Sequence, residues 1–407
     1  MRFIYNLILH LVQFLLPIVA LFNKKMRFFV RGRKNVISSL SQKIQPNDTV
    51  VWFHVSSLGE YEQGLPVMEA FKKEYPFYKI VLSFFSPSGY EIRKNNTIAD
   101  ITVYLPLDTR KNVRQFLNAV HPSKIFFIKY EFWPNYLIEI RKRHIPTFLV
   151  SGIVRENQLF FKKYGGFYRN LLHTFTHFFV QNTVSEKLLN SIGFYNVTVN
   201  GDTRFDRVSQ ILEKDNTIEI ISQFKNGKKT IVIGSSWPQD EALLVPYINQ
   251  SEHIKFIIAP HNIKPEAILN LKNQILKKTL LYSESDGADT GDFDVLIVDC
   301  IGILTKIYSY ADIAYVGGGF GNGIHNILEP ATFGIPVVIG PNFKKFQEAK
   351  DLVALGGCMV ITDQKSLQQT FTSLLSDDDI LKEKGMISKS FVLKNKNATQ
   401  AIMDYLH

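Results

Sequence analysis

Two acidic residues in the first half of the chain follow predicted strands, on the side where open α/β sheets bind ligands, and the first of them is a candidate general base. Glu60 follows the apolar run Val51–Val55 and lies in the first turn of a helical pattern. Glu131 comes just after the run Lys124–Ile128. A carboxylate at the turn from a strand to a helix can remove the proton of an attacking hydroxyl group. It can equally complement a helix dipole, or cap the helix that Pro134 begins, so both interpretations stay open.

An arginine near the middle of the chain is a candidate ligand for phosphate. Arg204 lies in NGDTRFDRV and follows the apolar run Val197–Asn200. A guanidinium offers paired N–H donors to phosphate oxygens, so Arg204 is predicted to stabilise charge on a departing phosphate. The alternative is an ion pair with a nearby aspartate.

A glycine-rich loop in the second half predicts a phosphate site. The segment from Gly317 to Gly323 holds five glycines, and a helical pattern begins at Asn326. Backbone amides in such a loop favour a phosphate, although the pattern matches neither the dinucleotide fingerprint nor a Walker loop. Glu329 is expected to bind ribose hydroxyls, whereas His325 either contacts the nucleotide or is structural. No HExxH, CxxC or clustered His/Asp set is present, so no metal or other resident cofactor is predicted.

The elements that position these residues alternate between short apolar runs and helical patterns. Apolar strands separated by helices predict parallel sheets covered on both faces. Two such series in tandem predict two Rossmann-like α/β domains facing a central cleft, with ligands beyond the carboxyl ends of the strands. The predicted strands are Val51–Val55, Lys79–Phe84, Lys124–Ile128, Thr147–Val150, Phe178–Gln181, Val197–Asn200, Thr230–Gly234, Lys255–Ala259, Thr279–Tyr282, Val295–Val298, Ile313–Val316 and Pro336–Ile339.

The length of 407 residues exceeds the size at which a single core stops growing, which favours two domains. The stretch from Asp206 to Lys229 is polar, charged and without a strand of its own, so it is the predicted linker. The predicted order is an N-terminal basic and apolar segment at 1–47, a first Rossmann-like domain at 48–206, a linker at 207–229, a second Rossmann-like domain at 230–397 and a C-terminal helix at 398–407.

Composition excludes several classes of protein. With 45% hydrophobic and 21% charged residues the chain is typical of a folded globular protein rather than a disordered one. Two cysteines cannot form a disulfide framework or a thiolate zinc site, which favours the cytoplasm. A net charge of +10 favours anionic partners.

The basic charge is concentrated at the N-terminus. The segment Met1–Asn47 holds eight Lys or Arg residues and no acid, and it includes the largely apolar run Phe3–Phe22. One interpretation is a buried amphipathic helix of the first domain. The other is a membrane helix, for which an interfacial position is favoured because Asn6 and Gln13 would be costly at the bilayer centre. The residues then expected against anionic headgroups are Lys24, Lys25, Arg27, Arg31, Arg33 and Lys34.

Taken together, the ordered motifs from Val51 to Asp363 resemble the 3-deoxy-D-manno-octulosonic acid (Kdo) transferases of lipopolysaccharide synthesis. The segments that carry the resemblance include WFHVSSLGEYE, SFFSPSGYE, YLPLDTRKNVRQFLNAVHP, YEFWPN, NGDTRFDR, GSSWPQDE, IIAPHN, DCIGILTKIYSYADIAYVGGGF and HNILEPA. The resemblance implies that Glu60 is the general base and that Glu131 stabilises the transition state. Arg204 stands where the family usually carries Lys.

The resemblance also implies a GT-B fold, CMP-Kdo as the donor substrate and the phosphorylated lipid A precursor lipid IVA as the acceptor. The reaction would be an inverting displacement that releases CMP at the cytoplasmic face of the inner membrane of a Gram-negative cell. His261 and Ile303 depart from the family, which usually has Arg and Glu at these positions. The residues implied to bind CMP are Pro260, His261, Ile301, Gly302, Ile303, Asn326, Ile327, Leu328 and Glu329.

Three other functions compete with this hypothesis. A UDP-sugar transferase or epimerase of the same fold would keep the chemistry and change the donor. A basic nucleic-acid-binding protein is disfavoured, because no RNP motif, helix-turn-helix or basic-aromatic stripe is present. An NAD-dependent oxidoreductase is disfavoured by the absence of the early glycine fingerprint.

Overall fold

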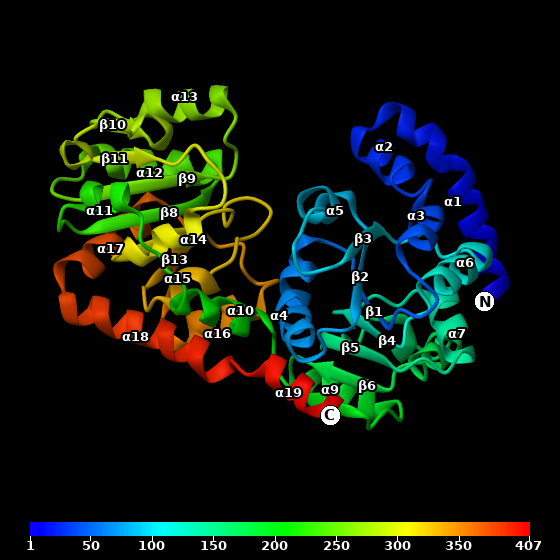
Figure 1. The fold of residues 1–407 in the computed structure, drawn as a ribbon. Helices are drawn as coiled ribbons and strands as arrows, with labels where there is room; N and C mark the ends of the chain where they lie inside the picture. The colour runs from blue at the N-terminus through cyan, green and yellow to red at the C-terminus, as the bar shows by residue number, and fades with distance from the viewer. The chain divides into compact units, whose positions relative to one another are not determined.

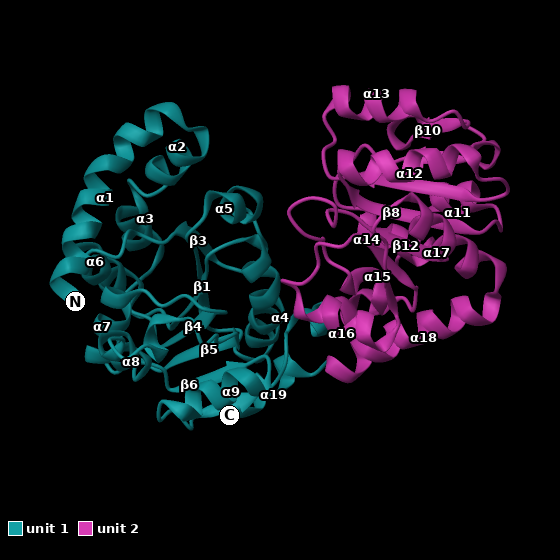
Figure 2. Ribbon diagram, turned by 180° about the vertical axis from the view of Figure 1, so that it is seen from behind, with its two compact units in different colours: residues 1–207, 396–407 teal, residues 208–395 magenta.

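The computed structural model describes residues 1–407 as two compact units (Figure 1, Figure 2). Unit 1 comprises residues 1–207 and 396–407, and unit 2 comprises residues 208–395. Each unit is built on one parallel sheet of seven strands with helices packed against it. The predicted α/β class with two Rossmann-like halves is therefore confirmed.

The sheet of unit 1 has the strand order β3-β2-β1-β4-β5-β6-β7. The chain runs outward from β1 to β3 and then returns to place β4 on the other side of β1. The carboxyl ends of β1 and β4 thus form the topological switch point, where open α/β sheets bind their ligands. The strands are β1 Val50–Val55, β2 Lys79–Phe84, β3 Ile101–Tyr104, β4 Lys124–Ile128, β5 Thr147–Gly152, β6 His177–Val180 and β7 Val197–Val199.

The helices of unit 1 cover both faces of this sheet. Strand β1 is buried along its whole length, and its alternate side chains enter opposite cores. Trp52 packs with Phe116 and Phe127 on one face, whereas Phe53 stacks on Phe126 on the other. The helices are α1 Arg2–Phe22, α2 Lys24–Arg31, α3 Val36–Lys43, α4 Leu58–Glu74, α5 Pro87–Arg93, α6 Arg110–Val120, α7 Pro134–Lys142, η1 Leu159–Phe161, α8 Gly166–Leu172, α9 Thr183–Ser191, α10 Arg204–Ser209, which reaches into unit 2, and α19 Ala398–Leu406.

The sheet of unit 2 has the strand order β10-β11-β9-β8-β12-β13-β14. Its switch point lies between β8 and β12, since the strands that follow β8 are placed first on one side and then on the other. The strands are β8 Thr230–Ser236, β9 Lys255–Pro260, β10 Thr279–Leu281, β11 Val295–Ile297, β12 Ile313–Val316, β13 Val337–Ile339 and β14 Cys358–Val360. The helices are η2 Gln210–Glu213, α11 Glu219–Lys225, α12 Pro238–Gln250, α13 Pro265–Gln274, η3 Tyr282–Glu284, η4 Thr290–Asp292, α14 Leu304–Ile307, η5 Tyr308–Tyr310, α15 Leu328–Thr332, α16 Gln347–Leu355, α17 Gln364–Ser376 and α18 Asp378–Asn395.

Two strands and one boundary differ from the sequence prediction. The short edge strands β3 and β14 were not predicted, and both are only partly buried along their length. The segment 207–229 is not a free linker, because it belongs to unit 2 from Val208 onward. Its helix α11 buries Ile221 and Phe224 in the core of that unit.

The C-terminal helix returns to the first unit. Helix α19 packs against α4, and its residues Ile402 and Met403 are buried in the same cluster as Phe71. The chain therefore crosses between the units twice, near Arg207 and near Lys396.

Candidate active site and nucleotide site

Glu60 lies at the switch point of unit 1, in the first turn of α4. Ser56 and Ser57 form the turn between β1 and α4, and the Ser56 N–H donates a hydrogen bond to Oε2 of Glu60. The side chain is only 4% exposed. Burial, followed by repulsion from Glu131, raises the pKa of Glu60 to about 7, although the Ser56 hydrogen bond acts in the opposite direction. A carboxyl group with this pKa can accept a proton near neutral pH.

Glu131 lies at the end of the neighbouring strand β4 and is held by an aromatic residue. Trp133 donates from Nε1 to Oε2 of Glu131 at 2.9 Å and also approaches Nε2 of His54 at 3.2 Å. Helix α7 begins at the following residue, Pro134, which fixes the position of Trp133 at its N-terminus. Both carboxyl groups at this switch point are therefore positioned by the starts of helices.

His54 completes this cluster and was not singled out from the sequence. It is fully buried on β1, and its Nδ1 lies 2.8 Å from Oγ of Ser83. Its Nε2 lies 3.5 Å from Oε2 of Glu131. Because Trp133 is a donor only, the arrangement fits an imidazole that accepts at Nε2 and donates at Nδ1 toward Ser83. A histidine inside an apolar strand gives no sequence signal beyond that of a core residue.

Lys129 joins β4 to this cluster in an unusual backbone conformation. Its φ angle is 74°, a left-handed value that costs a side-chain-bearing residue about 1–2 kcal/mol. Its positive charge counteracts the rise in the pKa of Glu60. Backbone strain of this kind is concentrated at functional sites, which supports a functional role for this strand end.

Arg204 forms an ion pair with Asp202, which is the structural alternative that its sequence context left open. Its Nε and Nη2 donate to Oδ2 of Asp202 at 2.9 and 2.7 Å. Burial would raise the pKa of Asp202, but the charge and hydrogen bonds of Arg204 outweigh it and hold that pKa below its ordinary value. Gln63 of α4 also donates to Asp202 at 3.2 Å, so Arg204 is linked to the helix that carries Glu60.

Three rings stack beside the switch point of unit 2. Trp237 follows β8, His261 follows β9, and His325 belongs to the loop after β12. The ring of Trp237 is stacked on that of His261 with centroids 4.3 Å apart, and its Nε1 donates to Nε2 of His325 at 3.0 Å. Burial lowers the pKa of both histidines, so near neutral pH they present uncharged rings. His325 is thus bonded within the site rather than isolated.

Asp240 organises these loops and was missed in the sequence analysis. Its buried carboxylate accepts hydrogen bonds from the N–H groups of Trp237 and Gly318 and from the hydroxyl of Tyr315, at 2.7 to 2.9 Å. It is the third residue of α12 and forms part of a capping box. The motif WPQD carries this signal, since an acidic residue three positions after a helix start commonly bonds back to the chain.

The glycine-rich loop allows a close approach of backbones. A Cβ atom on Gly317 would lie 2.4 Å from the carbonyl oxygen of Ser235, and one on Gly319 would lie 2.6 Å from Cα of Gly340. Gly318 and Gly323 have φ angles of 93° and 131°, which favour glycine. The loop therefore packs closely against the ends of β8 and β13. The amides of Gly317, Gly318, Gly321 and Gly323 already donate hydrogen bonds within the protein.

The residues implied to bind CMP do not all present side chains to solvent. His261, Ile301, Gly302 and Asn326 are exposed, and Ile301 is 84% exposed. The side chains of Ile327 and Leu328 are buried in the core, so the predicted contacts of these two residues with a nucleotide would have to come from their backbone. Pro260 ends β9, and Ile303 precedes α14, both partly buried.

Glu329 is held by neighbouring side chains at the start of α15. Its Oε2 accepts from Oγ1 of Thr305 at 2.7 Å, and its Oε1 accepts from Nδ2 of Asn326 at 3.0 Å. These bonds join α14, which contains Thr305, to α15 and to the loop before it. The helix is shorter than the predicted 326–333, since it covers Leu328–Thr332.

The N-terminal helix α1 is exposed over most of its length but is fastened near its start. By length and composition it could cross a membrane, and apolar residues such as Phe14 and Phe22 point to solvent. Tyr5 donates to Oδ2 of Asp108 at 2.7 Å, and Asn6 accepts from Asn135 at 2.8 Å. A wholly buried helix is therefore wrong, and an exposed apolar helix supports membrane association.

Arg33 does not belong with the exposed basic residues of this segment. Its guanidinium donates to the carbonyl oxygens of Leu105, Phe29 and Phe85 and lies 3.5 Å above the ring of Phe29. The prediction that Arg33 faces lipid headgroups is therefore wrong, because its side chain turns into unit 1. The other five cations of the group, Lys24, Lys25, Arg27, Arg31 and Lys34, are exposed.

Comparison with solved structures defines the class. The UDP-GlcNAc 2-epimerase of Neisseria meningitidis aligns with 88% of this chain and 99% of its own at a TM-score of 0.62 and 15% identity. MurG of Acinetobacter baumannii aligns with 88% of this chain and 98% of its own at a TM-score of 0.56 and 14% identity. The chain thus has the GT-B fold of glycosyltransferases and sugar-nucleotide epimerases.

Sequence comparison then gives the family. Residues 28–207 match the family model for 3-deoxy-D-manno-octulosonic-acid transferase (kdotransferase). The enzyme of that name from Chlamydophila psittaci is 29% identical over 80% of this chain and 77% of its own, and that from Aquifex aeolicus is 27% identical over 80% and 86%. The one from Haemophilus influenzae is 25% identical over 88% and 86%. Residues 28–207 are therefore a domain of the Kdo transferase family, and the chain is a glycosyltransferase.

Proposed function

We propose that this protein transfers Kdo from CMP-Kdo to a hydroxyl group of lipid IVA and releases CMP. The observation that carries the proposal is the buried Glu60, whose pKa of about 7 suits a base that must accept a proton from a sugar hydroxyl. It lies within the residues that match the Kdo transferase model. The basic, apolar N-terminal segment suits an acceptor that is a phosphorylated lipid.

The proposed step is a direct displacement. Glu60 takes the proton of the acceptor hydroxyl while its oxygen forms a bond to the anomeric carbon of Kdo. The bond from that carbon to the phosphate oxygen breaks, and its electron pair leaves with CMP from the opposite face, so the configuration inverts. Glu131, held by Trp133, stabilises the positive charge that develops on the sugar ring.

Unit 2 is proposed to hold the donor without a resident cofactor. The glycine-rich loop would bind the phosphate through donors other than the amides of Gly317, Gly318, Gly321 and Gly323, and Glu329 would bind the ribose hydroxyls. His261 stands where the family usually carries Arg and donates fewer hydrogen bonds. Arg204, fixed by Asp202, is proposed to stabilise the departing phosphate, which carries less charge than a diphosphate.

The test is a mass-spectrometric transfer assay with CMP-Kdo and tetra-acylated lipid IVA. The expected product is the acceptor with Kdo added, and Glu60→Gln should reduce turnover by about 10²–10⁴-fold while CMP binding survives. Glu69→Gln, on the same helix, is the matched control. Transfer from a UDP-sugar instead of CMP-Kdo, or undiminished turnover in Glu60→Gln, would contradict the proposal.

The proposed location is the cytoplasmic face of the inner membrane. Helix α1 offers exposed apolar side chains, and five exposed cations follow it between Lys24 and Lys34. An amphipathic segment flanked by cations binds an anionic bilayer surface through both apolar burial and charge. Unit 1 would thereby be brought to the lipid acceptor.

A further inference from the structure

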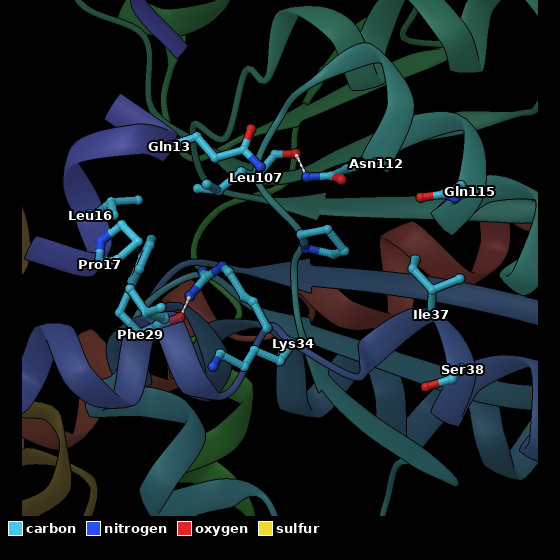
Figure 3. A pocket seen from close by; sticks show the side chains of 13 residues that line it. Gln13, Leu16, Pro17, Phe29, Lys34, Ile37, Ser38, Leu107, Asn112 and Gln115 are labelled. Atoms are coloured by element: carbon cyan, nitrogen blue, oxygen red, sulfur yellow. Dashed lines mark hydrogen bonds between the residues drawn. The ribbon is translucent and has the colours of Figure 1, made fainter. Parts of the chain in front are cut away.

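Unit 1 holds a pocket of about 610 Å³ between α1, α2, α3 and the segment from the end of β3 into α6 (Figure 3). Leu16 and Pro17 of α1 line one side, and Leu107, beyond the carboxyl end of β3, lines another. Phe29 and Ile37 contribute further apolar surface. This volume lies within the range of about 300–1,000 Å³ that is typical of small-ligand sites.

The charged side chains that line the pocket are all positive. Arg33 and Lys34 are part of its lining, and no carboxylate is. Neither cation forms an ion pair, and the three acceptors of the Arg33 guanidinium are neutral carbonyl oxygens. The burial of Arg33 lowers its pKa to about 9, which reflects a cation without a neutralising anion. An apolar pocket with two unpaired cations is complementary to an acyl chain attached to an anionic group.

The pocket is also connected to the carboxyl groups at the switch point. The Nη2 atom of Arg33 donates to the carbonyl oxygen of Phe85 at 2.6 Å. The ring of Phe85 lies 4.5 Å from that of Trp133, whose Nε1 is bonded to Glu131. Arg33, which lines the pocket, is therefore connected to Glu131 through Phe85 and Trp133.

From this arrangement we infer that the pocket binds one acyl chain of the phosphorylated lipid acceptor, with a phosphate against Arg33 and Lys34. The inference rests on the proposed function for the identity of the lipid, but the pocket's chemistry stands on the structure alone. It extends that function by assigning recognition of the acyl chain to the α1–α3 layer.

The first experiment measures binding without any transfer reaction. Dodecyl phosphate below its micelle concentration serves as the probe, and dodecyl maltoside and inorganic phosphate serve as its uncharged and chain-free counterparts. Calorimetry should give one site for dodecyl phosphate, at least tenfold weaker binding of dodecyl maltoside and no binding of inorganic phosphate. Equal binding of both detergents, or no saturable binding of dodecyl phosphate, overturns the inference.

Two pairs of variants locate the site. Ser38→Trp fills the pocket from an exposed position on α3, whereas Ser41→Trp places the same ring almost one turn further along that helix, at an exposed residue that is not part of the lining. We expect Ser38→Trp to weaken dodecyl phosphate at least tenfold and Ser41→Trp to leave it unchanged. Lys34→Gln should weaken it about fivefold, and Lys43→Gln, outside the lining, should not. Unchanged binding in Ser38→Trp overturns the inference.

The second experiment compares acceptors. Ser38→Trp should raise KM for acylated lipid IVA at least tenfold and leave KM for the deacylated phosphorylated disaccharide unchanged. Equal KM values for both proteins on the acylated acceptor would assign the pocket to another membrane lipid and overturn the inference. A wild-type protein that binds dodecyl phosphate in this pocket but transfers no Kdo would instead refute the proposed function alone.

Discussion

Glu60 should destabilise the folded protein at the pH where it acts as a base. Its pKa rises from the ordinary 4.5 to about 7 in the folded state. Between these two pH values the folded protein therefore keeps a proton on Glu60 that the unfolded chain has lost. Stability therefore falls as the pH rises from about 4.5 to about 7, and it stays lower above that range. Replacing the carboxyl group by an amide removes this penalty.

The size of the effect follows from the two pKa values. Each pH unit between 4.5 and about 7 is worth about 1.4 kcal/mol, which gives about 3 kcal/mol at pH 8. Glutamine keeps an oxygen that can accept the Ser56 N–H bond, so the local geometry is preserved. Glu60→Gln should thus be about 3 kcal/mol more stable than wild type at pH 8 and nearly equal to it at pH 4.5.

The assay is urea unfolding of both proteins at several pH values from 4.5 to 8. Glu69→Gln provides the control, because Glu69 lies on the same helix and makes no ion pair or hydrogen bond. It should follow the wild-type pH dependence. In parallel, kcat/KM of the wild type should fall below pH 7 as Glu60 becomes protonated. A constant stability difference between Glu60→Gln and wild type across this range would refute the argument from burial.

Three further predictions concern the other parts of the molecule. Asp240→Asn should lower the free energy of unfolding by about 2–3 kcal/mol in urea titrations, because three donors lose a charged acceptor; unchanged stability would contradict this. Glu329→Ala should weaken CMP about tenfold in calorimetry, whereas the exposed Glu284→Ala should not, and equal affinities would remove Glu329 from the nucleotide site. Replacing the exposed cations by Gln should release much of the protein from anionic vesicles at low salt, since each contributes about 1 kcal/mol, while salt-resistant binding of this variant would favour a spanning helix. The replaced cations are Lys24, Lys25, Arg27, Arg31 and Lys34.

The fold could be predicted because the core strands are continuous apolar runs. All the predicted strands exist, whereas β3 and β14 were not predicted; they have only four and three residues, and periodicity cannot identify such a short apolar run as a strand. The linker was misplaced because α11 is polar on one side and buries only Ile221 and Phe224. Composition averaged over that segment conceals the buried face.

The site was only partly accessible from the sequence. The turn containing Glu60 marks a candidate base, but its pKa depends on burial and on Glu131, which is far away in the sequence and adjacent in the fold. Arg33 was assigned to the surface because charged residues usually lie there. Arg33 lies in the turn after α2, and its contact with Phe29 depends on the path of that turn, which the sequence pattern does not reveal.

Hydrogen bonds near the start of α1 fix the orientation of this helix relative to the rest of unit 1. Tyr5 binds the same buried Asp108 whose carboxylate accepts the N–H groups of Asn135 and Tyr136 at the start of α7. The helix therefore cannot rotate about its first turn without breaking the hydrogen bond to Asp108, the residue that also holds the start of α7. If α1 binds the bilayer surface as proposed, the search for an acceptor becomes lateral diffusion in two dimensions, with the carboxyl ends of β1 and β4 held at a constant distance from that surface. The encounter rate would then depend on the number of acceptor lipids per unit area rather than on their bulk concentration.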